Sequence, residues 1–333
     1  MYKAIYKKNF YIFIYLTLFF IICIISLKIG IETYSFSKLY NTLFFLNENT
    51  NSTFIIHEVR IPRIIIGAFC GMLFAISGCI LQTVFHNPMA APDILGINAA
   101  SSFFLLINFC YFSNYFYTLN IYFSVLGALI GFTIALLFTL ESRKISPIRL
   151  VIVGIACGVL FKALCQFLIM QTNEKTSALL KFIAGSLYHA NWDTFKQIII
   201  PGSLFLFLAF IFQKKLDILL LNETESRSIG FATTKWKFIY ILLALCLSAV
   251  AVAGCGSLGF VGLISPNIAK LFFGNKHSYS LIGSALVGAN ITILSDFLGR
   301  NIYHPYEIPV GLMTIVLGVP YFIILLNKSR KNI

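Results

Sequence analysis

Nine or ten apolar stretches of membrane-spanning length recur along this chain of 333 residues, and they limit its fold more than any other feature. About 20 apolar residues suffice for a helix to cross a bilayer, and only helices and closed barrels satisfy their backbone in lipid. The sequence therefore predicts an all-α membrane protein, a polytopic bundle of about ten transmembrane helices. The predicted spans are 9–28, 61–85, 95–112, 119–140, 148–170, 194–213, 237–253, 259–273, 280–298 and 308–326.

The composition agrees with this class of protein. Hydrophobic residues make up 59% of the chain and charged residues 11%, whereas a soluble protein is about a quarter charged. No polar stretch is long enough for a separate soluble domain, so we expect one transmembrane domain over 1–333. The net charge of +13 lies in short loops, where membrane topology explains it better than a nucleic-acid partner.

The N-terminal run 10–27 follows Lys3, Lys7 and Lys8, so a signal peptide is an alternative to a first helix. No small-residue cleavage site follows the run, and we predict a retained helix. With the N-terminus inside, the inside segments carry 16 Lys or Arg and the outside segments seven. This bias predicts cytoplasmic N- and C-termini. Lys162 and Lys196 lie within spans.

Three arginines are predicted on the outside, against this general bias: Arg60, Arg63 and Arg300. They could be long basic side chains that anchor helix ends at the membrane surface. They could also form a basic docking surface for an acidic partner, because charges at a rim orient encounters. Asp296 lies four residues before Arg300, and the spacing predicts an ion pair between them.

Glycine pairs and helix breaks mark places where helices pack closely or a pathway passes. Three pairs have G-x-x-x-G spacing, which favours close packing in lipid, although a pathway lined by small residues is the alternative. The segments "FHNPMAAPDILG" (85–96) and "GCGSLGFVGLISPN" (254–267) interrupt apolar sequence, and irregular backbone at membrane depth needs cover from protein or a water-filled cavity. The pairs are Gly67 and Gly71, Gly127 and Gly131, and Gly154 and Gly158.

The sequence lacks the motifs of nucleotide hydrolysis and of common catalytic sites. It contains no G-x-x-x-x-G-K-[ST], H-E-x-x-H or G-x-S-x-G, and its eight cysteines form no C-x-x-C pair. We therefore predict no catalytic residue, no metal site and no cofactor. His57, His189 and His304 are predicted outside, where they could touch an iron or haem ligand or lie by chance. Acids cluster in loops, so the energy for transport is expected from another subunit.

The longest inside loop, 214–237, has features of a contact segment. Its leucines fall at helical spacing beside charged residues, and Gly230 ends the pattern. Such a segment could lie on the membrane surface or offer an amphipathic face to a soluble protein. The acids of the loop favour a protein partner. The residues concerned are Leu216, Asp217, Leu219, Leu220, Glu223, Glu225 and Arg227.

Four stretches together resemble one family, the FecCD-type permease subunits of bacterial ABC importers for iron–siderophore complexes, haem and vitamin B12. The motifs NP-x-A-x-P-D-x-L-G and GFVGLI-x-P are specific, and the match runs from the second predicted helix to the C-terminus. The stretches are "RIPRIIIGAFCGMLFAISGCILQTVFHNPMAAPDILGIN" (60–98), "LDILLLNETESRSIGF" (216–231), "GSLGFVGLISPNIAKLFFGNKH" (256–277) and "LSDFLGRNIYHPYEIPVGLMTIVLGVPYFIILL" (294–326).

The resemblance implies a ten-helix permease in the bacterial cytoplasmic membrane. It works as a homodimer or close heterodimer with two ATP-binding cassette subunits below and a substrate-binding protein outside. Arg60 and Arg63 match the docking motif R-x-P-R, and Arg300 matches D-x-x-x-R. The resemblance therefore implies that these arginines meet glutamates on the binding protein.

Two further regions are implied by the resemblance. The 216–231 segment is similar to the coupling helices that seat in each ATPase, and Ser146–Gly158 with the tenth helix resembles the elements that line and gate the pathway. The chain departs from the family pattern at Asn267, Lys270 and Pro147. The implied coupling residues are Leu219, Leu220, Glu223, Arg227 and Gly230, and the implied pathway or gate residues are Ser146, Pro147, Gly154 and Gly158.

The expected function is import of an iron(III)–siderophore or haem complex, powered by ATP hydrolysis on partner subunits. A vitamin B12 permease of the same family is the main alternative. An ion-coupled secondary carrier and a non-transporting membrane scaffold are alternatives from other classes. The helix-breaking segments argue against the scaffold, and the scarcity of intramembrane acids argues against the carrier.

Overall fold

The computed structural model describes residues 2–30, 32–44, 51–112, 119–141, 144–145, 147–171, 176–221, 223–303 and 306–330. Within these residues it is helical apart from one short antiparallel hairpin, so the predicted all-α class is confirmed. The elements are α1 (Tyr2–Lys28), α2 (Phe36–Phe44), α3 (Asn51–Phe54), the π-helix η1 (Ile55–Arg60), α4 (Ile61–Val84), α5 (Ile97–Tyr111), α6 (Asn120–Thr139), β1 (Leu140–Glu141), β2 (Lys144–Ile145), α7 (Pro147–Met170), α8 (Thr176–Ile183), α9 (Trp192–Ile211), α10 (Gln213–Ile218), α11 (Glu223–Ser228), α12 (Thr233–Cys255), α13 (Val261–Phe273), α14 (His277–Asn301) and α15 (Val310–Arg330).

Each predicted span falls on a helix of the structure. Among the described residues, seven helices are long and apolar enough to cross a membrane, and three further apolar helices are shorter. Helices α5 and α13 adjoin the helix-breaking segments, which explains their length, and the third is the part 310–324 of α15. Ten crossings with cytoplasmic termini stay a prediction.

Helix α4 lies at the centre of the bundle and is its most buried candidate span. It packs against α12, α13 and α14, and glycines make these approaches possible. A Cβ on Gly71 would lie 2.5 Å from the Gly288 carbonyl oxygen, and a Cβ on Gly78 would overlap the Gly262 carbonyl. The close packing predicted for Gly71 is therefore what the structure shows.

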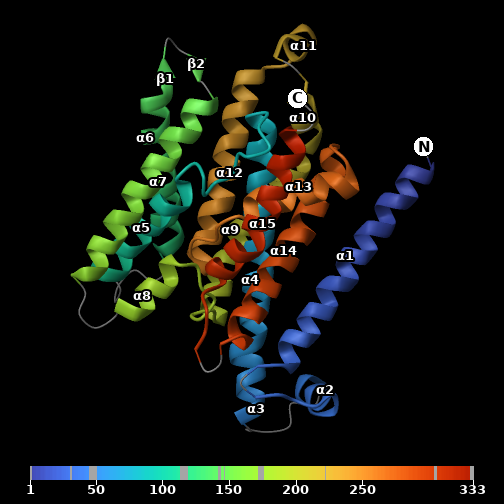
Figure 1. Ribbon diagram of the computed structural model, residues 1–333, viewed down its shortest axis with the longest axis vertical. Helices are drawn as coiled ribbons and strands as arrows, with labels where there is room; N and C mark the ends of the chain where they lie inside the picture. The colour runs from blue at the N-terminus through green and yellow to red at the C-terminus, as the bar shows by residue number, and fades with distance from the viewer. Residues whose placement is uncertain are drawn as a thin grey trace.

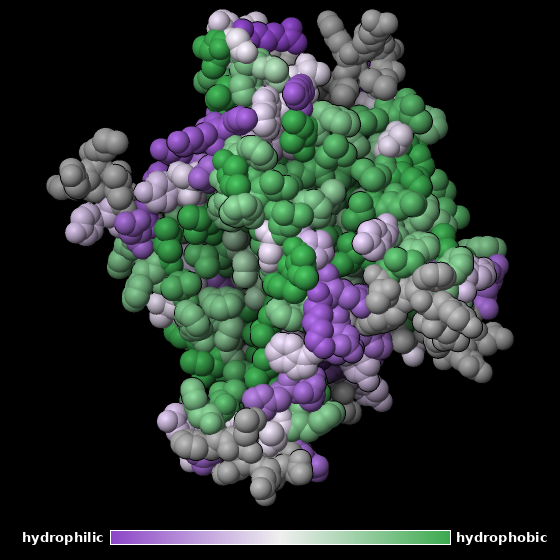
Figure 2. Space-filling model, turned by 180° about the vertical axis from the view of Figure 1, so that it is seen from behind, coloured by the Kyte–Doolittle hydropathy of each residue, from purple (hydrophilic) through white to green (hydrophobic). Residues whose placement is uncertain are grey.

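Around α4, the other helices form two flanks (Figure 1). On one flank α5, α6 and α7 pack against one another, and α5 and α6 contact α12. On the other flank α1 lies along α14 and leaves most of its apolar side chains exposed, as in a helix that faces lipid. Figure 2 shows hydrophobic residues over much of the far face, with hydrophilic residues gathered mainly toward the two ends and in a strip across the lower half.

The two helix-breaking segments pack on each other inside the bundle. Asp93 Oδ2 accepts a hydrogen bond from the backbone N–H of Phe260 at 3.3 Å, and Asn267 Nδ2 donates to the Pro88 carbonyl at 2.9 Å. Phe260 has a φ of 65°, a conformation that few bulky residues adopt. Contacts between the segments thus satisfy backbone that the breaks leave without helical partners.

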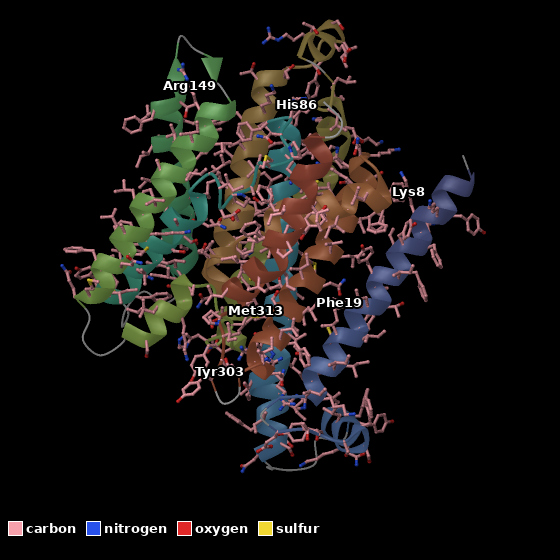
Figure 3. All side chains as sticks on the ribbon, viewed as in Figure 1. Lys8, Phe19, His86, Arg149, Tyr303 and Met313 are labelled. Atoms are coloured by element: carbon pink, nitrogen blue, oxygen red, sulfur yellow. The ribbon has the colours of Figure 1, made fainter. Side chains whose placement is uncertain are left out.

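The bundle has two distinct ends (Figure 1). One carries α10, α11 and the β1–β2 hairpin, and the first turns of α1 and last turns of α15 lie toward it. We call it the inner end, following the predicted topology, and the end with α2, α3 and α8 the outer end. Figure 3 places Arg149 toward the inner end and Tyr303 toward the outer one.

Candidate functional site

The outer end is held together by a buried cluster of charges around Arg63. Arg63 Nε donates to Asp296 Oδ1 at 2.8 Å, and its two terminal nitrogens donate to the Glu307 carboxylate at 3.2 and 3.0 Å. The Arg63 side chain is 7% exposed, Asp296 2% and Glu307 22%. One arginine therefore links α4, α14 and the segment before α15.

Arg300 extends the cluster toward α1. Its Nε lies 3.1 Å from Asp296 Oδ2, which confirms the ion pair expected from the four-residue spacing. Its Nη2 donates to Ser26 Oγ, near the end of α1. Asp296 thus contacts two arginines, and paired charges with several hydrogen bonds are what permits such burial.

Arg60 anchors the connection between α1 and α2. Its guanidinium donates to the carbonyl oxygens of Leu27 and Glu32 and lies 4.8 Å from the Tyr34 ring centroid. A Cβ on Gly30 would lie 2.7 Å from Arg60 Nη2, so the guanidinium packs closely against the backbone of this connection. Burial and the hydrogen bond that Tyr34 donates to Glu32 raise the pKa of Tyr34 to about 12, so this donor keeps its proton at neutral pH.

The three arginines lie at the outer end. They are largely buried and bind other parts of this chain, and they do not form an exposed basic surface. Arg60 is 4% exposed and Arg63 6%. Of the acidic partners, Asp296 was predictable from its spacing, whereas Glu307 and Glu32 were not predicted. Only the spacing of Asp296 and Arg300 carried a local signal, since Glu307 is 244 residues from Arg63. Docking of a binding protein by these arginines remains a prediction.

Buried leucines pack the inner segment α10–α11 against the helix bundle. Leu216 and Leu219 are 0% and 1% exposed, whereas Leu220 is 39% exposed. Leu220, Leu221 and Ile229 therefore form the apolar part of the surface that the segment presents outward. Arg227 is also exposed, and Gly230 has a φ of 76° with no atom near its side-chain position. The side chain of Glu223 lies outside the described residues.

A buried polar chain connects this segment to the central helix. His277 Nδ1 donates to Asp217 Oδ1 at 2.7 Å, and the His277 backbone N–H donates to the same oxygen at 2.8 Å. On the other side of the ring, His277 Nε2 lies 2.8 Å from Thr83 Oγ1. Three residues thus join α10, the start of α14 and the end of α4. This chain was not predicted from the sequence, because no local spacing links its members.

The family departures at Asn267 and Lys270 lie in the same inner region and keep hydrogen-bond partners. Asn267 Nδ2 donates to the Leu263 carbonyl at 2.8 Å as well as to Pro88. Lys270 Nζ donates to Gln82 Oε1 at 2.8 Å. Both side chains therefore tie α13 to its surroundings.

The residues implied for the pathway or gate are placed only in part. Ser146 lies outside the described residues, and Pro147 begins α7, with its side chain not described. A Cβ on Gly154 would lie 2.8 Å from Leu95 Cα, and one on Gly158 would lie 3.4 Å from Gly96 Cα. These two glycines pack α7 against the start of α5, and their part in a pathway stays a prediction.

A cavity of about 540 Å³ opens between η1, α8 and α9 near the outer end. Its polar lining includes Glu58, Asn120, His189 and Asn191, beside aromatic rings. Burial and the nearby Lys181 lower the pKa of His189, so its ring is neutral at neutral pH. His57 Nε2 lies 3.1 Å from the Thr42 carbonyl. Over the part of the chain that the structure describes, no three His, Cys, Asp or Glu side chains are grouped to hold a metal ion.

Comparison with known proteins identifies a family. The model of the FecCD transport family matches residues 18–328. The Fe(3+)-citrate import system permease protein YfmE of Bacillus subtilis is 35% identical over 315 residues, covering 94% of this chain and 93% of that protein. The Iron(3+)-hydroxamate import system permease protein FhuG of B. subtilis is 33% identical, over 93% and 94%. The Fe(3+) dicitrate transport system permease protein FecD of Escherichia coli is 30% identical, over 83% and 86%.

A solved structure has the same fold. It is described as an inward-facing conformation of a metal-chelate type ABC transporter, and it aligns with a TM-score of 0.80 and 28% sequence identity. The alignment covers 96% of this chain and 99% of that one.

Proposed function

The chain belongs to the FecCD transport family, and from this premise we propose that it carries an iron(III) chelate, of the siderophore or haem kind, into the cytoplasm. A member of this family is a multi-pass permease of the bacterial cytoplasmic membrane and not an enzyme. The observation that supports the cargo is the agreement among relatives, whose names specify ferric citrate, ferric dicitrate and ferric hydroxamate. None of these three names specifies cobalamin.

Permeases of ABC importers work with ATPase and binding-protein partners. We propose the finer composition of two permease subunits, two ATPase subunits and one binding protein, with the second permease either identical or closely related. The single domain 1–333 would contribute half of the pathway. Substrate would enter from the binding protein and leave into the cytoplasm as the pathway opens alternately to the two sides.

At the inner end, the exposed surface of α10–α11 would seat on the ATPase. Leu220 and Ile229 would supply its apolar contacts, and Arg227 a positive charge. Leu216 and Leu219 fix the segment to the bundle, so movement of the ATPase would move α10 with it. The chain Asp217–His277–Thr83 would pass that movement to α14 and α4.

At the outer end, Arg60, Arg63 and Arg300 would contribute to docking of the binding protein. Glu307 is the most exposed member of the cluster. A carboxylate of the binding protein could therefore displace Glu307 from Arg63 and take its place as the partner. Docking would then be coupled to the contacts between α4, α14 and α15 that surround the cluster.

The test is ATP-dependent uptake in vesicles that contain the permease, its ATPase and its binding protein. We expect radioactive iron supplied as a ferric chelate to accumulate only with ATP and binding protein, and cobalamin not to accumulate. Uptake by the permease alone, without nucleotide, would instead support an ion-coupled carrier. Cobalamin uptake in the absence of iron uptake would favour the alternative cargo.

A further inference from the structure

Helix α7 turns a broad apolar side outward, and one charged residue lies within it. Ile155, Val159 and Phe167 on this side are 51%, 63% and 59% exposed. Lys162 is exposed on the same side, with exposed Gln166 one turn further along. A lysine on the apolar surface of a membrane-spanning helix is costly unless water or protein surrounds it.

Lys162 lies too far from either end of α7 for its ammonium to reach the membrane surface readily. Met170, at the outer end of α7, lies eight residues beyond Lys162, about 12 Å at the rise of an α-helix. Pro147, at the inner end, lies fifteen residues before it, about 22 Å away. Side chains on a helix lean toward its N-terminus, so the lysine leans away from the nearer surface. It therefore faces an aqueous or protein-lined space.

No hydrogen bond or ion pair holds Lys162 within the described residues. A Cβ on Gly158, one turn before Lys162, would lie 3.4 Å from Gly96 Cα, so this part of α7 lies beside the broken segment that contains Asp93. The Asp93 Oδ2 already accepts a hydrogen bond from the Phe260 N–H. A Cβ on Gly259 would lie 3.6 Å from that oxygen and 3.5 Å from Ile315 Cγ1 of α15. Lys162 thus stands near the place where both broken segments meet α15.

Helix α15 also leaves an apolar side open. Leu312, Ile315 and Val316 are 48%, 38% and 61% exposed, and α7 and α15 both lie on the near side of the bundle in Figure 1. Asp93 is already engaged by backbone, and among the described residues Lys162 has no acid within bonding distance. The charge complements an anion.

We propose that the Lys162 ammonium faces the translocation pathway and favours an anionic cargo, so that the ferric chelate carried by this permease bears a net negative charge. The inference rests on the proposed function. In a homodimer two copies of Lys162 would line one pathway, and a passing anion would relieve their repulsion. Chelates that bind iron(III) through carboxylates or catecholates fit this requirement, whereas a neutral or cationic trihydroxamate complex does not.

The experiment compares lysine variants in vesicles that hold the complete importer, with radioactive ferric citrate as the anionic probe and a neutral ferric trihydroxamate as the second. We expect Lys162→Met to lower ferric citrate uptake about tenfold, a loss of about 1.4 kcal/mol. Lys162→Glu should lower it further, and Lys162→Arg should retain it. Lys196→Met is the matched control. Like Lys162, Lys196 is exposed within a predicted span, but it is paired with Asp193.

Assembly with the ATPase and stimulation of ATP hydrolysis by the binding protein are measured for each variant and should not change. Undiminished ferric citrate uptake by Lys162→Glu would overturn the proposal, as would loss of assembly by Lys162→Met, which would indicate a subunit contact. If the unmodified importer takes up the neutral complex but not ferric citrate, the anionic cargo is wrong and the proposed function stands. If it takes up neither complex, and neither a ferric catecholate nor haem, the proposed function itself fails.

Discussion

Asp296 contacts two arginines at once, with Oδ1 at 2.8 Å from Arg63 Nε and Oδ2 at 3.1 Å from Arg300 Nε. The three side chains are at most 9% exposed. Removing one partner of such a group leaves a buried charge without compensation, and this costs more than the intact pair contributes.

We therefore expect Asp296→Asn to destabilise the permease strongly, by about 3–5 kcal/mol. The measurement is thermal unfolding of the detergent-solubilised protein. Asp193→Asn is the control, because Asp193 and Lys196 form an ion pair whose side chains are 71% and 74% exposed, and exposed pairs contribute little. Equal melting temperatures for the two variants would contradict the buried cluster.

At this scale the sequence predicted only what lies close along the chain. The pair Asp296–Arg300 follows from helical spacing. The contact of Glu307 with Arg63, and that of Asp217 with His277, depend on how distant helices pack. The same limit explains why the arginines were expected to face an external partner. The bias of charges along the chain predicts at which end of a helix an arginine lies, but not which residue it contacts.

Among the elements, long apolar helices were predictable because length and composition alone define a membrane span. The short helices α2, α3 and α8 were not, since isolated helices of this length owe their form to packing. The 216–231 segment shows the difference. Its leucine spacing predicted one amphipathic stretch, whereas the structure breaks it into α10 and α11 and buries Leu219 but not Leu220.

Helix α4 depends on glycine where it crosses α13. We expect Gly78→Ala to reduce the yield of folded permease severely, because its Cβ would overlap the Gly262 carbonyl, which is backbone and cannot rotate away. Gly158→Ala should be tolerated, since its Cβ would meet only Gly96 Cα at an ordinary 3.4 Å and alanine favours the helix. The measurement is the monodisperse fraction after solubilisation, and a normal yield for Gly78→Ala would contradict the crossing.

The contact between α10 and α14 leads us to a prediction about how ATP hydrolysis is coupled to import. We expect Asp217→Asn and His277→Gln to lower the number of chelate molecules imported per ATP hydrolysed, because either change weakens the 2.7 Å contact through which α10 holds α14. Both rates are measured on the same vesicles. Thr17→Ala on the exposed side of α1 is the control. An unchanged ratio with intact assembly in both variants would show that the contact only stabilises the fold.

Over the whole molecule, the two ends are joined by the same central helix. Helix α4 carries Arg63 at the outer end and Thr83 at the inner end, and both have partners on α14. The α4–α14 pair therefore connects the charge cluster of the outer end with the polar chain of the inner end. The proposed docking of a binding protein and the proposed seating on an ATPase would act on the same two helices.

This arrangement allows a test of docking that separates it from stability. If carboxylates of the binding protein compete with Glu307 for Arg63, then Glu307→Gln should strengthen docking several-fold, although it removes an ion pair from the permease. Raised salt should weaken docking to the unmodified protein, because salt screens the attraction between the positive cluster and the carboxylates of the approaching binding protein. The affinity of the binding protein for the reconstituted importer is measured for both proteins across a salt series, with Glu32→Gln as a control at the same end. Weaker docking by Glu307→Gln would mean that Arg63 serves only to hold α4, α14 and the segment before α15 together.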